Sequence, residues 1–169
     1  TPNELDALRK SKSVRVVDIR DVDAYAAKHI PGAVSAPYDE WRGPSSNPGE
    51  LPDLALLAPL VRRLGLHPAV HAVLVSSGED VSDVGAAARV YWSLKVLGLT
   101  ELSILNGGLE AWEAARLPQG AAPVAVQAST FVPTLDRSLI ASRDDVRALI
   151  ASKQARLVDA RPADFFRGH

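Results

Sequence analysis

Short runs of β-branched and aliphatic residues alternate along this chain with longer stretches whose apolar residues recur at helical spacing. The clearest runs cover residues 14–19, 72–75 and 102–105, and a shorter one covers 33–35. Such runs are typical of strands buried on both faces, and parallel strands need crossover helices between them. The pattern therefore predicts an α/β doubly wound domain, with a central parallel sheet of about five strands and helices on both faces.

The helical stretches carry their own start and stop signals. Thr1 and Glu4 form a capping box around Pro2, and we expect Leu5 and Leu8 to point inward from the helix that follows. Further helices are predicted over residues 21–28, 54–64, 83–97 and 109–115.

Composition excludes several kinds of site and partner. Nineteen Lys and Arg residues balance 20 Asp and Glu residues, so no strong field attracts nucleic acid or an anionic membrane, and we expect neither as a partner. The chain has no cysteine, which excludes disulfides, zinc-thiolate sites and a thiol nucleophile within these residues. His67 and His71 are separated by Pro68 and lack a third ligand, so we expect no metal and no cofactor. The composition suits a soluble protein of the cytoplasm, or of the periplasm or exterior after removal of a signal peptide.

An internal repeat divides the chain. Residues 116–135 contain three prolines and no sustained periodicity, which predicts an extended linker. At an offset of 141 residues, matching pairs appear on either side of it: Thr1 and Ser142, Asp18 and Asp159, Arg20 and Arg161, Tyr25 and Phe166. One further residue aligns His29 with His169. We therefore expect a first domain over residues 1–118, a linker over 119–137, and over 138–169 the start of a second copy whose remainder is missing. In that copy Ser142 and Asp145 are expected to form a capping box, and Val158 and Asp159 to lie in a strand.

The turn after residues 72–75 is the predicted ligand site, because doubly wound sheets bind ligands beyond the carboxyl ends of their strands. It opens with Ser77, and Asp83 is expected to cap the helix that follows. Motifs around this turn resemble those of the rhodanese family in its tandem form. They are Asp18-Ile19-Arg20, His29-Ile30-Pro31-Gly32-Ala33, Val73-Leu74-Val75-Ser76-Ser77-Gly78 and Leu105-Asn106-Gly107-Gly108-Leu109-Glu110-Ala111-Trp112.

The resemblance implies a sulfurtransferase. Family members move sulfane sulfur from thiosulfate or mercaptopyruvate, through a cysteine persulfide, to cyanide or another thiophilic acceptor. That cysteine opens a six-residue loop, and Ser77 stands at its position here. The degenerate loop is Ser77, Gly78, Glu79, Asp80, Val81 and Ser82. A serine oxygen cannot hold a persulfide, so the resemblance implies a non-catalytic first domain, with no catalytic residue in this segment.

In tandem members the second domain supplies the cysteine, so we expect the partners to be that domain of the same chain and a small sulfur-donor anion. The remaining motif residues are expected to be structural: Asp18, Arg20, His29, Pro31, Gly32, Gly107, Gly108, Trp112, Asp159 and Arg161. Trp41 and Arg42 lie in a long loop, where an exposed aromatic and a cation are expected to face the second domain. The alternative is a non-enzymatic rhodanese-like binding or regulatory module, which Ser77 fits equally well.

Overall fold

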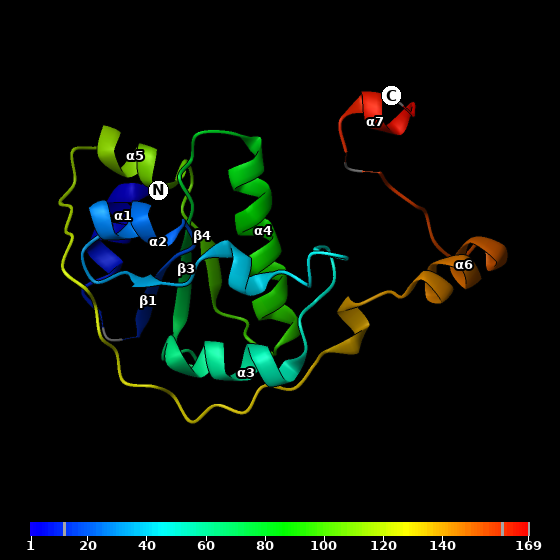
Figure 1. The fold of residues 1–169 in the computed structure, drawn as a ribbon, viewed down its shortest axis with the longest axis horizontal. Helices are drawn as coiled ribbons and strands as arrows, with labels where there is room; N and C mark the ends of the chain where they lie inside the picture. The colour runs from blue at the N-terminus through cyan, green and yellow to red at the C-terminus, as the bar shows by residue number, and fades with distance from the viewer. Residues whose placement is uncertain (12, 160, 169) are drawn as a thin grey trace. The chain divides into compact units, whose positions relative to one another are not determined.

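A parallel sheet forms the centre of the first part of the chain (Figure 1). The computed structural model describes residues 1–11, 13–159 and 161–168. The sheet order is β2-β1-β3-β4, and each neighbouring pair is parallel. The strands are β1 (Val14–Asp18), β2 (Val34–Ser35), β3 (His71–Val75) and β4 (Leu102–Ile104). The parallel α/β architecture is confirmed, although the described residues form four strands rather than about five.

Helices cover both faces of this sheet (Figure 1). On one face lie α1 (Pro2–Leu8), α2 (Val22–Ala27) and α5 (Gly108–Ala114). On the other lie α3 (Leu54–Arg63), α4 (Val81–Val96) and the 3-10 helix η1 (Tyr38–Trp41). Strand side chains alternate between the two cores: Ala72 and Leu74 join the α3/α4 core, whereas Val73 and Val75 join the α1/α2/α5 core.

Two side chains lie elsewhere than predicted. Leu8 is 46% exposed, because α1 ends at this residue and only its middle, at Leu5, covers the sheet. Trp41 is fully buried in the α3/α4 core and donates its indole N–H to the carbonyl of Ala36 at 3.2 Å. The prediction of an exposed aromatic at Trp41 is therefore wrong, since η1 turns the ring inward. Arg42 stays partly exposed, and its guanidinium lies 5.4 Å from the ring centre of Tyr38.

The extended segment 119–136 lies along the first part of the chain instead of standing apart from it. Gly120 exchanges two backbone hydrogen bonds with His29, at 2.7 and 2.9 Å. Further along, the N–H and the hydroxyl of Ser129 donate to the carbonyls of Arg62 and Leu66, at 2.9 and 2.7 Å. This segment adds no strand, because its backbone bonds go to loop and helix carbonyls. The chain accordingly divides into two units, Thr1–Asp136 and Arg137–His169.

The second unit contains η2 (Arg137–Leu139), α6 (Arg143–Ser152) and α7 (Ala163–Phe166). The predicted capping box forms between Ser142 and Asp145. The strand expected around Val158 is absent from the described residues, because no neighbouring strand pairs with it, and Val158 is 79% exposed. The repeat's histidine, His169, lies outside the described residues. Across the described helices of both units, none has the length and apolar character needed to span a bilayer.

Candidate functional site

The predicted site lies where β1 and β3 end side by side, since Asp18 pairs with Val75 in the sheet register. Two loops leave the sheet here, one leading into α2 and the other, opened by Ser77, into α4. Ser77 is half-buried and lines two cavities, of about 500 and 210 Å³. Ser77 is therefore accessible to small molecules, to which it presents a hydroxyl.

Two carboxylates of the chain accept hydrogen bonds from the backbone N–H groups of this loop. Asp83 Oδ2 accepts the backbone N–H groups of Gly78 and Glu79, at 3.1 and 2.9 Å. Asp80 Oδ1 accepts those of Ser82 and Asp83, at 2.7 and 3.1 Å. Asp80 is the N-cap of α4, so the prediction that Asp83 caps this helix is wrong. Asp83 lies in the first turn, and its side chain reaches back over the loop instead.

The Gly107-Gly108 turn packs backbone to backbone against the Ser77 loop. The N–H groups of Leu109 and Glu110, in the first turn of α5, donate to the carbonyls of Ser76 and Ser77 at 2.8 and 2.9 Å. Gly78 has a φ of +92°, and a Cβ atom there would lie 2.1 Å from the Gly107 carbonyl oxygen. Glycine is required at this contact both by its φ and by the lack of space.

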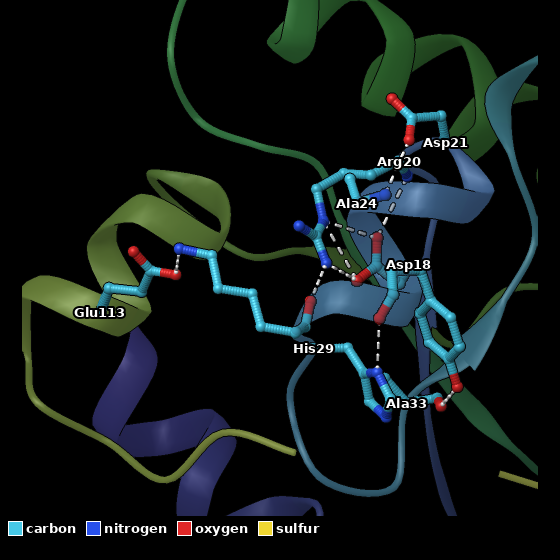
Figure 2. A network of polar contacts seen from close by, with 9 residues as sticks. Asp18, Arg20, Asp21, Ala24, His29, Ala33 and Glu113 are labelled. Carbon is cyan, nitrogen blue, oxygen red and sulfur yellow. Dashed lines mark hydrogen bonds and ion pairs between the residues drawn. The ribbon is translucent and has the colours of Figure 1, made fainter. Parts of the chain in front are cut away.

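A buried ion pair closes the end of β1 (Figure 2). Arg20 donates from Nε to Asp18 Oδ1 at 3.0 Å and from Nη2 to Asp18 Oδ2 at 2.6 Å. Nη2 also donates to the Lys28 carbonyl at 2.7 Å, which ties the end of α2 to the strand. Asp18 is fully buried and the Arg20 side chain is 7% exposed. The pair has the geometry expected of a structural motif.

The His29-Ile30-Pro31-Gly32 segment is held from several sides. His29 Nδ1 lies 2.8 Å from the Tyr25 carbonyl, and the two rings stack with centroids 4.0 Å apart. The Tyr25 hydroxyl donates to the Ala33 carbonyl at 2.7 Å, and burial raises the pKa of that phenol. Arg9 donates to the Pro31 carbonyl at 3.2 Å, and Gly32 adopts a φ of +87°. These contacts position the turn.

Trp112 is fully buried and donates its indole N–H to the Pro118 carbonyl at 2.9 Å. His71 Nε2 lies 2.8 Å from the Ser103 hydroxyl. Within the described parts of the chain, no three His, Cys, Asp or Glu side chains gather as metal ligands would.

The second unit repeats the Asp–Arg motif of the first. Arg161 donates from Nε to Asp159 Oδ1 at 2.9 Å and from Nη2 to Asp159 Oδ2 at 2.6 Å. These hydrogen bonds lower the pKa of Asp159 to about 2. Phe166, which matches the buried Tyr25, is 72% exposed. The two copies thus share local geometry and differ in burial.

Sequence reasoning missed two contacts at this site. The first is the pair of hydrogen bonds that Asp83 accepts from the N–H groups of Gly78 and Glu79. An acidic residue in the first turn of the helix, shortly after a glycine turn, could have indicated it. The second is the ion pair between Lys28 and Glu113, at 2.5 Å, which joins α2 to α5. Nothing local connects residues so far apart in the sequence.

The comparisons with known proteins agree with this architecture. The family model of the rhodanese-like domain matches residues 1–115. Thiosulfate sulfurtransferase of Gallus gallus is 34% identical over 146 residues, covering 85% of this chain and 50% of that protein. The 3-mercaptopyruvate sulfurtransferase of Homo sapiens is 29% identical, covering 96% of this chain and 59% of that protein.

A crystal structure of a 3-mercaptopyruvate sulfotransferase from Escherichia coli aligns with a TM-score of 0.81 at 24% identity, covering 98% of this chain and 66% of that one. That likeness shows the fold. The chain spans about half the length of the curated relatives it matches. With the family model matched over most of the chain, and the parallel sheet, the Asp18–Arg20 pair and the paired glycines in place, the chain belongs to the rhodanese family.

Proposed function

We propose that this chain is part of a tandem rhodanese sulfurtransferase, in which the first unit is a non-catalytic domain and the second copy carries the cysteine. Sulfane sulfur would come from thiosulfate or 3-mercaptopyruvate and pass to cyanide or another thiophilic acceptor. The names of the relatives support sulfur transfer, and the repeated Asp–Arg motif supports a second copy.

The observation that carries the non-catalytic role is the state of the Ser77 loop. In the proposed reaction a cysteine thiolate attacks the sulfane sulfur of thiosulfate, the new S–S bond forms, and sulfite leaves. Ser77 offers a hydroxyl, which is a far weaker nucleophile at neutral pH and forms no persulfide. The loop amides that would face the donor anion already bind Asp83 and Asp80.

A second candidate function is a non-enzymatic binding module. Val81 and Val84, on the first turn of α4, are 82% and 59% exposed beside the acidic loop. Exposed aliphatic side chains next to charged ones are common at protein contacts.

A thiocyanate assay with thiosulfate and cyanide tests the first proposal on the natural full-length protein and on this chain. We expect the full-length protein to form thiocyanate, this chain to form none above background, and Ser77→Ala to leave the full-length activity unchanged. Loss of activity on replacing a cysteine of the second copy locates the nucleophile. Full-length protein that transfers no sulfur from thiosulfate or 3-mercaptopyruvate would favour the binding module.

A further inference from the structure

The larger cavity beside Ser77 lies between α2 and α5, entirely within the first unit. Its volume is about 500 Å³, and Ala24, Ala27 and Leu109 supply its apolar wall. Its polar lining consists of two cations, four carboxylates and a hydroxyl: Arg20, Lys28, Asp21, Glu79, Glu110, Glu113 and Ser77. A cavity of this size with a few polar groups of both signs is suited to a small charged molecule.

Arg20 has unused hydrogen-bonding capacity toward this cavity. Its Nε and Nη2 atoms donate to Asp18 and to the Lys28 carbonyl. Among the described residues, no acceptor is bonded to Nη1, which carries two further N–H donors. Figure 2 shows this guanidinium nitrogen directed away from Asp18, toward the side on which Glu113 lies. Because the side chain is 7% exposed and held by Asp18, these donors are preorganised for a carboxylate.

The rest of the lining disfavours a simple anion. Glu113 is paired with Lys28, whereas Asp21, Glu79 and Glu110 form no ion pair with any described residue. An anion on Arg20 would therefore face three carboxylates that no described cation compensates. A simple cation would be attracted to those carboxylates but would leave the Nη1 donors unused.

We propose that this cavity binds a small zwitterion of the α-amino acid class. The carboxylate of the ligand accepts from Arg20 Nη1, and its ammonium group lies toward Glu110 and Glu79. A short aliphatic side chain packs against Ala24, Ala27 and Leu109. Glu110 is well placed for this role, since its own N–H is fixed to the Ser77 carbonyl at the start of α5. This site goes beyond the proposed sulfur transfer, because it needs no cysteine and lies in the unit assigned no chemistry.

Isothermal titration of this chain with three matched probes tests the proposal: L-alanine, propionate and ethylamine. Propionate and ethylamine each keep one of the two charged groups of L-alanine. We expect L-alanine to bind at least about tenfold more tightly than either, which corresponds to about 1.4 kcal/mol. Absence of L-alanine binding at about 50 mM, or propionate binding as tightly as L-alanine, overturns the proposal.

Two variants place the ligand in the cavity without disturbing the buried Arg20. Glu110→Gln should weaken L-alanine binding at least about fivefold. Glu79→Gln is the second variant and should weaken it in the same direction. Glu101→Gln, an exposed residue outside the cavity, is the matched control and should leave the affinity unchanged. Unchanged affinity in both cavity variants contradicts the assignment. The thiocyanate assay does not affect these outcomes, so failure of the amino-acid site can be distinguished from failure of the proposed sulfur transfer.

Discussion

The guanidinium of Arg20 lies against the carboxylate of Asp18, with Nη2 2.6 Å from Oδ2, in the interior at the end of β1. Arg161 and Asp159 repeat this arrangement in the second unit, also with 2.6 Å between Nη2 and Oδ2. In both pairs the arginine stands two residues after the aspartate, so the partners are supplied by one short segment of the chain. The Asp–Arg pair therefore forms in both copies, whereas its contribution to the free energy of unfolding depends on burial.

Replacing each arginine by glutamine should separate these two effects. Arg20→Gln leaves the Asp18 carboxylate buried without its cation, and we expect it to lower the free energy of unfolding by about 3–5 kcal/mol. Arg161→Gln is the matched control, because that pair is solvent-exposed, and it should leave the urea midpoint of the first unit unchanged. Equal loss of stability in the two variants would show that burial is not the source of the effect.

The Asp159 carboxyl should titrate at a pH of about 2. Its pKa is lowered in the folded chain, so the interaction is complete above the unfolded pKa of about 4 and is lost as the pH falls through about 2. In Arg161→Gln we expect the pKa to return to about 4. Carboxyl chemical shifts followed by NMR measure both values, and an unaltered pKa in the variant would contradict the assigned cause.

Gly78 and Gly32 form a matched pair for testing the backbone contact at the loop. Both have positive φ, +92° and +87°, but only Gly78 has atoms within reach of an added Cβ. Gly32→Ala should lower the free energy of unfolding by about 1–2 kcal/mol, because alanine disfavours a positive φ. Gly78→Ala should lower it by about twice as much or more, since its Cβ would also clash with the Gly107 carbonyl. Thermal unfolding of both variants measures the difference; similar losses would mean that the Gly107 turn moves aside easily.

A cysteine at position 77 should remain unreactive while Asp83 holds the loop amides. Ser77→Cys is then the only thiol in the chain, so intact mass after thiosulfate treatment gives a clean result. We expect no added sulfur in Ser77→Cys and one added sulfur in Ser77→Cys with Asp83→Ala, where the freed N–H groups can face the anion. Sulfur addition to both proteins at the same rate would show that Asp83 does not prevent the reaction.

The segment 119–136 should contribute to the stability of the first unit. Its partly buried apolar side chains pack against the α3/α4 core: Val124, Val126, Phe131 and Leu135. We expect a protein ending at residue 118 to be about 3–5 kcal/mol less stable than one ending at residue 136. Urea unfolding of the two proteins measures this, with the complete 169-residue chain as the reference. Equal stability would make the segment a free linker.

Patterns along the chain predicted most of the elements. The β-branched runs located β1, β3 and β4, and the capping boxes located the starts of α1 and α6. These signals are local, because strand and helix periodicity and capping involve residues a few positions apart. The errors came where local rules compete. Trp41 opens a loop rich in Gly, Pro and Ser, which predicts exposure, yet η1 turns its ring into the core.

At the site, too, some features follow from the sequence and others only from the tertiary structure. The order of the motifs, the serine at position 77 and the lack of any cysteine are properties of the covalent chain, and they suffice to predict a rhodanese fold without a sulfur-accepting residue. The occupants of the loop amides and the direction of the free Arg20 nitrogen depend on distances across the fold. Asp83 was the predicted cap of α4, but in the folded loop Asp80 is the N-cap and Asp83 accepts from the N–H groups of Gly78 and Glu79. Hydrogen bonds act within about 3 Å, so their partners are chosen when the elements pack together.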